Sequence, residues 1–450
     1  MKRKIAVLGL SACLMALASC GPKPLILKGP RFPARTPLDQ VMKDADKPNA
    51  PQPQLTPKNR ALPIRLSAGV ANADWPQRMG GPTHRLPPLA LATSLTQAWE
   101  APIGKANDRR HKITAEPVVA GGRIFTIDSR STVTATSTEG KRLWSADLTP
   151  AGDRADAATG GGLAYGAGKL FVATGFGELL AVDPATGHVD WRQKFHSAIS
   201  GTPTVENGIV YVITRGSTAW AIAASNGKIR WQLDGTETVT AVPGAAGPAL
   251  SPRWALLPFP SGQLVGALKP GGAQIWATTI AGRRLGQGYA SFTDITGDPV
   301  VDGGTVFVGN ASGGVMALDI NSGNRIWSAR EGVVSPVWPA GGSVFLISDE
   351  AKLKRLDAAT GDPIWSVQLP YYVPVRREKN RRDIYPDYGP ILAGGRLIVA
   401  SGNGRILSFD PVNGRELSSV SMPAGAASEP VVAGRTLYVV TTDGKLRAFR

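Results

Sequence analysis

The sequence predicts an all-β fold: an eight-bladed β-propeller with four-stranded antiparallel blades, closed into a ring by an N-terminal strand. Two observations carry this prediction. A unit of short apolar strands separated by glycine turns recurs eight times, and a lone copy of the unit's ending stands ahead of the first unit. The 53 glycines and 36 prolines suit a protein with many tight turns.

Each unit begins with a proline, or once with a glycine, followed by two mostly apolar residues. The eight starts are Pro117, Gly162, Pro203, Pro248, Pro299, Pro336, Pro390 and Pro430. Six units end on a glycine with a tryptophan four residues later, namely Gly140/Trp144, Gly187/Trp191, Gly227/Trp231, Gly272/Trp276, Gly323/Trp327 and Gly361/Trp365. In the seventh ending, Ser418 stands at the tryptophan position after Gly414.

The lone ending, Leu95 to Trp99, precedes the first start, and the chain stops at Arg450 before an eighth ending. A ring needs this arrangement, because the first strand then completes the last blade and leaves no open edge. Residues 95–450 give about 44 residues per unit, within the range of about 40–45 for a four-stranded blade.

The fifth unit illustrates the role of each segment. Residues 306–308 and 315–318 are apolar runs, as expected for strands covered on both faces by neighbouring blades. Asp319 and Gly323 shape the following turn, and Trp327 lies on the outermost strand. We expect the tryptophans to pack between blades, with each indole N–H donating to a neighbouring backbone. These structural residues are Trp99, Trp144, Trp191, Trp231, Trp276, Trp327 and Trp365.

Antiparallel strands, lettered A to D outward from the axis, place the A–B and C–D turns on one face and the B–C and D–A loops on the other. The long D–A segments are residues 105–112, 278–298 and 371–388, and the last contains Arg376, Arg377, Arg381 and Arg382. Longer loops on one face indicate the working surface. The net charge of +16 favours anionic partners such as lipid head groups or acidic proteins. A solvated basic face that only adds solubility is the alternative.

The N-terminus predicts export and lipidation. Lys2, Arg3 and Lys4 precede an apolar stretch, residues 5–18, that is too short to span a bilayer as an anchor. The stretch ends Leu-Ala-Ser-Cys20, which resembles the lipobox of bacterial lipoproteins. We therefore expect a signal peptide over 1–19, a lipidated Cys20, a flexible proline-rich tether and arm over 20–94, and the propeller over 95–450. Residues 71–94 are interpreted as an ordered arm, with continued linker as the alternative.

Two features bear on the protein's location. Gly21 follows the cysteine where an aspartate typically retains lipoproteins at the inner membrane, so the resemblance implies the periplasmic face of the outer membrane. An exported lipoprotein makes nucleic acid an improbable partner despite the basic composition.

With Cys13 in the signal peptide and Cys20 acylated, the mature domain has no disulfide and no thiolate ligand.

The sequence offers no catalytic, cofactor-binding or metal-binding set. The four histidines have no metal-ligand spacing, and Asp294, Asp298 and Asp302 fit no calcium loop. A nucleophile elbow and a P-loop are both absent from the sequence. We expect a protein that is not an enzyme and that requires no cofactor.

Residues 181–191 and 317–327 resemble the tryptophan-docking repeats of quinoprotein dehydrogenases. That resemblance concerns the scaffold, since those enzymes hold a quinone beside a disulfide of adjacent cysteines and use an aspartate base with calcium. The adjacent cysteines are missing here. A quinone-dependent dehydrogenase remains an alternative hypothesis.

The lipobox, the tether and eight such blades together resemble the BamB family, lipoproteins of the outer-membrane β-barrel assembly (Bam) complex. The resemblance implies a non-catalytic periplasmic scaffold that binds the periplasmic domains of the Bam A subunit and assists insertion of outer-membrane proteins. It also implies a monomer within a hetero-oligomeric complex. A third hypothesis is a lipoprotein that binds anionic lipid or cell-wall polymer through its basic loops.

The family's partner-binding positions match in part. One acidic loop position falls on Asp294, and its second appears as Thr296. A Leu-x-Leu-Arg loop of the family corresponds loosely to Thr240-Ala241-Val242-Pro243, which lacks the arginine. The candidate contact residues are therefore Asp294, Thr240, Val242, Arg376, Arg377, Arg381 and Arg382, all in D–A loops.

Overall fold

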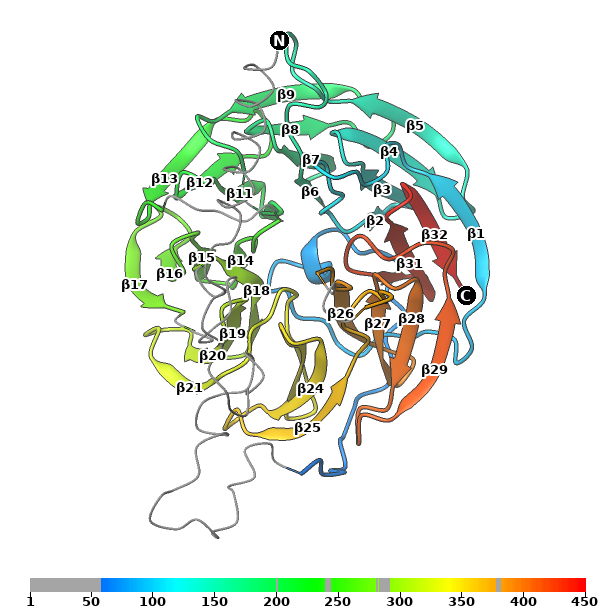
Figure 1. The fold of residues 1–450 in the computed structure, drawn as a ribbon. Helices are drawn as coiled ribbons and strands as arrows, with labels where there is room; N and C mark the ends of the chain where they lie inside the picture. Colours follow the sequence, from blue (N-terminus) through cyan, green and yellow to red (C-terminus); the bar gives the residue numbers. More distant parts are fainter. Residues whose placement is uncertain (1–57, 200, 239–243, 281, 283–291, 378–381) are drawn as a thin grey trace, which may run out of the picture. The chain divides into compact units, whose positions relative to one another are not determined.

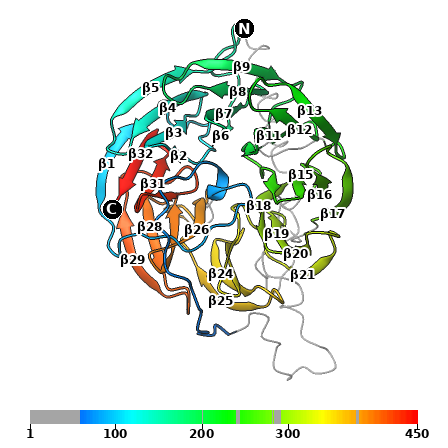
Figure 2. The same ribbon diagram turned by 180° about the vertical axis from the view of Figure 1, so that it is seen from behind.

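Eight four-stranded antiparallel sheets surround a common axis in the computed structural model (Figures 1 and 2). The structure describes residues 58–199, 201–238, 244–280, 282, 292–377 and 382–450, which fall within one compact unit, Thr56–Arg450. Each sheet is one blade, with strand A nearest the axis and strand D outermost. The predicted eight-bladed propeller is confirmed.

The first four blades follow one another along the chain. Blade 1 consists of β2 (Val118–Ala120), β3 (Arg123–Ile127), β4 (Thr132–Ser137) and β5 (Arg142–Asp147). Blade 2 consists of β6 (Gly161–Gly166), β7 (Lys169–Thr174), β8 (Glu178–Val182) and β9 (Val189–Lys194). Blade 3 consists of β10 (Thr204–Glu206), β11 (Ile209–Ile213), β12 (Thr218–Ala223) and β13 (Ile229–Asp234). Blade 4 consists of β14 (Ala249–Leu250), β15 (Trp254–Pro258), β16 (Gln263–Leu268) and β17 (Gln274–Thr279).

The last four blades complete the ring. Blade 5 consists of β18 (Ile295–Asp302), β19 (Thr305–Asn310), β20 (Gly314–Asp319) and β21 (Arg325–Ala329). Blade 6 consists of β22 (Trp338–Ala340), β23 (Ser343–Ile347), β24 (Lys352–Asp357) and β25 (Pro363–Gln368). Blade 7 consists of β26 (Asp387–Ala393), β27 (Arg396–Ser401), β28 (Arg405–Phe409) and β29 (Glu416–Ser421). Blade 8 consists of β30 (Val431–Ala433), β31 (Thr436–Thr441), β32 (Lys445–Phe449) and β1 (Gln97–Pro102).

The N-terminal strand closes the ring as predicted. β1 pairs antiparallel with β32, with Trp99 opposite Ala448. Thr96 and Arg450 exchange two backbone hydrogen bonds of 2.8 and 3.0 Å at the end of this pair. The fourth strand of blade 8 therefore comes from the start of the propeller and its other three from the end.

Burial explains why these residues form these strands. The middle strands, such as β19 and β20, are almost entirely buried because neighbouring blades cover both of their faces. The outer strands alternate between covered and exposed positions, as in β9. Each outer strand also has a β-bulge immediately before the tryptophan position, for example between the pairs Ala317–Trp327 and Leu318–Arg325. Such bulges interrupt an exposed edge that could otherwise pair with another chain.

The seven blade tryptophans join consecutive blades. Each indole N–H donates to a backbone carbonyl at the C–D corner of the next blade, at 2.8–3.2 Å. The indole also packs beneath the glycine of that corner. Gly323 has a φ of 69°, and a Cβ atom there would lie 2.4 Å from the Trp276 ring. Glycine at this corner is thus required both by the backbone and by the approach of the indole.

Residues 58–94 cross the centre of the ring (blue in Figure 1). They begin before the arm expected over 71–94, and from here on we call all of 58–94 the arm. Their one helical turn, η2 (Arg78–Gly80), lies near the axis. The arm contacts glycines of the A–B turns: Gly121 donates its N–H to Asp74, and Gly434 donates to the carbonyl of Asn72. The arm therefore covers the face formed by A–B and C–D turns, called the turn face. The opposite face, formed by B–C and D–A loops, is called the loop face.

Candidate interaction surface

Three consecutive D–A loops present apolar side chains on the loop face. They connect blades 4 and 5, 5 and 6, and 6 and 7, and we call their described residues the loop surface: 280, 282, 292–294, 330–337, 369–377 and 382–386. Phe292, Val334, Val375 and Ile384 are each 41–48 % exposed there. Exposed apolar residues clustered on neighbouring loops mark a contact surface more than scattered ones do.

The two described ends of the loop between blades 6 and 7, residues 371–377 and 382–385, pair with each other, and we call them the hairpin. Tyr372 and Ile384 form an antiparallel bridge, and the Tyr385 N–H donates to the Tyr371 carbonyl at 2.8 Å. The rings of Tyr371 and Tyr372 lie 4.6 Å apart at its base. Arg376, Arg377 and Arg382 are exposed on these two ends. This hairpin therefore joins positive charge to apolar surface.

The loop between blades 5 and 6 is held from both sides. The Val333 N–H donates to the Asn310 carbonyl at 2.9 Å, and the Thr296 hydroxyl donates to the Val333 carbonyl. The Gly332 N–H donates to the Asp349 carboxylate at 3.0 Å. These bonds come from blades 5 and 6, so the loop that exposes Val334 has a rigid base.

The predicted contact residues divide into three groups. Arg376, Arg377 and Arg382 lie together on the hairpin. Asp294 is 1 % exposed at the base of its loop. Burial lowers the pKa of Arg215, and the charge of the Asp294 carboxylate opposes that shift. Cys20, Thr240, Val242 and Arg381 lie outside the described residues.

A cluster of buried charged residues on the ring axis was not anticipated from the sequence. Arg78 of the arm reaches three buried carboxylates, Glu116, Asp298 and Glu429, from blades 1, 5 and 8. All four residues are at most 7 % exposed. Each acidic residue directly precedes the proline that starts its blade, and that shared position is the signal in the sequence that could have revealed the cluster.

Burial and charge act against each other in this cluster. Burial disfavours the charged form of Arg78, but the three carboxylates together raise its pKa well above the usual value. Burial also raises the pKa of Glu116 to about 8, with Arg78 opposing that shift. Arg78 occupies the space between these carboxylates, and the residues that the structure describes contain no group of three or more acidic, histidine or cysteine side chains that could hold a metal ion.

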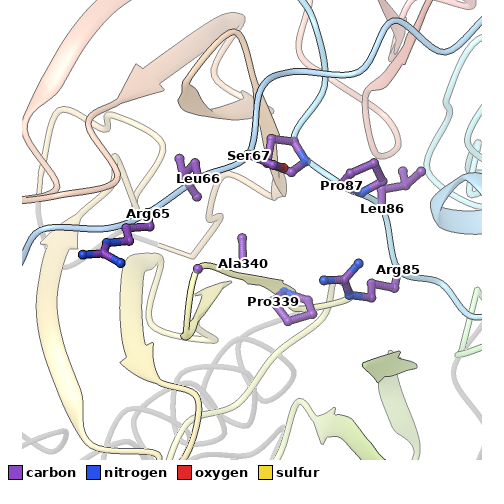
Figure 3. A pocket seen from close by; sticks show the side chains of 10 residues that line it. Arg65, Leu66, Ser67, Arg85, Leu86, Pro87, Pro339 and Ala340 are labelled. Atoms are coloured by element: carbon purple, nitrogen blue, oxygen red, sulfur yellow. The ribbon is translucent and has the colours of Figure 1, made fainter. Parts of the chain in front are cut away.

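A hollow of about 240 Å³ lies on the turn face between the arm and blade 6 (Figure 3). Arg65 and Arg85 come from two passes of the arm and flank Pro339 and Ala340. Arg85 is already paired with Asp302 at 2.6 Å. The hollow thus reflects how the arm packs over blade 6, on the face opposite the loop surface.

Comparison with known proteins identifies the family. The sequence profile described as outer membrane protein assembly factor BamB matches residues 129–367 and 376–450. The chain is 23 % identical to the protein of that name from Yersinia pestis over 371 residues, covering 81 % of this chain and 91 % of the relative. It is 24 % identical to the Burkholderia pseudomallei protein of the same name, covering 87 % of this chain and 98 % of the relative.

Solved structures share the fold. BamB from Moraxella catarrhalis superposes with a TM-score of 0.64 at 19 % identity, covering 79 % of this chain and all of that structure. The quinohemoprotein alcohol dehydrogenase of Comamonas testosteroni gives 0.63 at 16 % identity, covering 85 % of this chain and 81 % of that structure. At these identities the likeness concerns the propeller alone.

The residues of this chain do not fit a quinone site of the dehydrogenase type. Its two cysteines, Cys13 and Cys20, are not adjacent. The aspartates that could have suggested calcium are otherwise engaged, since Asp298 binds Arg78 and Asp302 binds Arg85. Within the described ranges, no helix has both the length and the apolar character needed to cross a bilayer. The chain belongs to the outer membrane protein assembly factor BamB family, to whose profile most of its propeller matches.

Proposed function

We propose that this protein is a non-catalytic periplasmic scaffold of the Bam complex, which assists the assembly and insertion of outer-membrane proteins. The observation that carries the proposal is the family match over most of the ring, since the relatives are named as assembly factors. A closed ring of rigid blades suits a scaffold because it holds many loops in fixed positions.

The partner we propose is a periplasmic domain of the Bam A subunit, docked on the loop surface. Val334, Val375 and Ile384 supply apolar contact, and Arg376, Arg377 and Arg382 supply positive charge beside it. Apolar anchors next to arginines are typical of protein interfaces and fit a partner with an acidic, partly apolar surface. Asp294 lies beneath this surface, so we propose that it supports the loops without touching the partner.

We further propose that Cys20 carries the lipid and that residues 20–57 tether the propeller to the periplasmic face of the outer membrane. Several acyl chains on one residue give stable anchoring. Confinement near the membrane raises the effective concentration of the scaffold around its partner without requiring tight intrinsic binding.

Crosslinking and affinity recovery of the lipidated protein from membranes tests the partner. The wild type should recover the A subunit, and the triple substitution Arg376→Ser, Arg377→Ser, Arg382→Ser should recover much less. The matched control, Arg142→Ser, Arg325→Ser, Arg415→Ser, removes the same charge from C–D corners of the turn face and should behave as wild type. Equal recovery by all three proteins would reject the loop surface, and no recovery by the wild type would reject the partner.

The same variants test binding to anionic lipid or cell-wall polymer. If the wild type is retained on anionic vesicles or sacculi and the hairpin variant alone is not, the lipid or polymer hypothesis gains support over the protein partner. The anchor has its own test: Cys20→Ser should move the protein from the membrane fraction to the soluble periplasmic fraction.

A further inference from the structure

All three guanidinium nitrogens of Arg78 contact carboxylates on the ring axis. Its two terminal nitrogens contact the two oxygens of Glu429 at 3.0 and 3.2 Å. Its Nε and one terminal nitrogen contact Asp298 at 3.0 and 2.9 Å. A terminal nitrogen also lies 3.6 Å from Glu116 Oε2. Such forked contacts match a planar guanidinium and do not match the compact ammonium of lysine.

Two of the three carboxylates, those of Asp298 and Glu116, have hydrogen-bond partners besides Arg78. The Gly247 N–H of blade 4 donates to the second oxygen of Asp298 at 2.8 Å. Glu116 Oε1 accepts from the Trp75 indole and from the Met79 N–H, at 3.2 and 3.1 Å. Its other oxygen, Oε2, is buried without a hydrogen bond and faces the guanidinium. The acceptors are therefore oriented toward one position on the axis.

The charges explain why that position requires a cation. Three buried acidic residues come from separate blades, and Arg78 contacts all three. The close ion pairs, at 2.9–3.2 Å, are those with Asp298 and Glu429. Removing one partner of a buried ion pair leaves uncompensated charge and is strongly destabilising. The arm that carries Arg78 also reaches blades 2 and 3, through Pro76 to Tyr165 and Gln77 to Val205. Arg78 thus belongs to a short stretch of the arm, residues 76–78, that contacts blades 1, 2, 3, 5 and 8.

We propose that Glu116, Asp298 and Glu429 form a guanidinium-binding site on the ring axis, and that the arm docks into the ring as an intramolecular ligand through Arg78. The site accepts a small free guanidinium compound when Arg78 is replaced by a smaller residue. This role is independent of the loop face and of any partner bound there.

Chemical rescue tests the proposal. Arg78→Ala should lower the Tm, and methylguanidinium at low millimolar concentration should raise it again in a saturable manner, as ligand binding to the folded state requires. Methylammonium should not rescue, because it lacks the planar fork. The matched control is Arg85→Ala, which removes another arm arginine that is 41 % exposed and paired with the partly exposed Asp302. Methylguanidinium should leave the Tm of this variant unchanged.

Limited trypsin digestion measures docking of the arm separately from global stability. Cleavage after Arg65 and Arg85, followed by intact mass, should be about a hundredfold or more faster in Arg78→Ala than in the wild type. Methylguanidinium should slow it again. Should the alanine variant not fold, Arg78→Lys takes its place and should show intermediate cleavage with no methylguanidinium effect. The proposal would be overturned if trypsin cleaved the Arg78 variant no faster than the wild type. It would also be overturned if methylguanidinium gave no saturable rescue of folded Arg78→Ala.

Discussion

The junction between blades 7 and 8 differs from the other blade junctions that the described residues form. Elsewhere a tryptophan of one blade packs beneath the corner glycine of the next and donates to its backbone. At blade 7 the tryptophan position is Ser418, and blade 8 has no continuous C–D corner, because its strands C and D belong to opposite ends of the propeller. A tryptophan there would have no corner glycine to pack against.

The arm bridges this junction in place of a tryptophan. The Leu89 N–H donates to the Leu392 carbonyl of blade 7 at 3.0 Å, and the Asn72 side chain donates to the Val432 carbonyl of blade 8 at 2.8 Å. The two passes of the arm are themselves hydrogen-bonded, Val70 to Pro88 and Ala90 to Val70. The junction without a tryptophan is thus joined from the turn face.

The hydrophobic cores reflect the same difference. From blade 1 to blade 6, separate clusters lie between successive blades. Blades 6, 7, 8 and 1 instead share one large cluster, which includes Trp75, Met79 and Leu89 of the arm. The repeat thus stabilises most of the ring locally, whereas the closing region depends on a segment outside the repeat.

The largest expected effect comes from removing a tryptophan at an ordinary junction. Trp327→Ala should lower the free energy of unfolding by about 3–5 kcal/mol, through lost burial and a cavity. Ser418→Ala, at the equivalent position of blade 7, should change it by no more than about 0.5 kcal/mol. Urea unfolding of both variants measures the contrast, and similar losses would contradict it.

A somewhat smaller effect is expected from the arm. Leu89→Ala should cost about 2–4 kcal/mol because the side chain is fully buried in the shared cluster. Amide hydrogen exchange should report the loss mainly in β26–β32, with β14–β21 little changed. Uniform loss of protection around the ring would show that the arm does not act on this junction in particular.

The corner glycine gives the third contrast. Gly323→Ala should cost about 2–3 kcal/mol, because it combines a positive φ with a Cβ too close to Trp276. Gly304, in the A–B turn of the same blade, has open space around its Cβ and no positive φ. Gly304→Ala should therefore leave the Tm unchanged, and an equal fall in both variants would refute the packing argument.

The smallest expected effect is a pH dependence of the free energy of unfolding, caused by Glu116 where it contacts the arm. Burial raises the pKa of Glu116 from an ordinary 4.5 to about 8, so its contribution to stability is complete below about pH 4.5 and is lost as the pH rises through 8. Between pH 6 and 7 this group alone should lower the free energy of unfolding by about 1.4 kcal/mol.

Glu116→Gln should remove that slope, because the amide oxygen can still accept from Trp75 and Met79. Burial also raises the pKa of Asp387, to about 6, and this group contributes a slope of the same sign in both proteins. Urea titrations of the two proteins at pH 6 and 7 isolate Glu116, and identical slopes would contradict the assignment.

Much of the fold could be predicted because the repeat is local in sequence. Apolar runs, turn glycines and a tryptophan at constant spacing determined the blades, and the lone ending at Trp99 determined how the ring closes. For the interaction surface, the alternation of turns and loops placed Arg376, Arg377 and Arg382 on one loop. That alternation could not indicate that Asp294 is buried, because burial depends on neighbouring loops whose sequences lie outside the repeat.

By itself, then, the sequence determined the number, order and closure of the blades, since hydrophobic period and turn chemistry act over a few residues. Only the tertiary structure decided what lies on the axis. Arg78 meets Asp298 and Glu429 across 220 and 351 residues, and no local pattern links an irregular arm to three separate blade starts. Those contacts exist because buried carboxylates require a cation, and the arm is the segment that brings one to the axis.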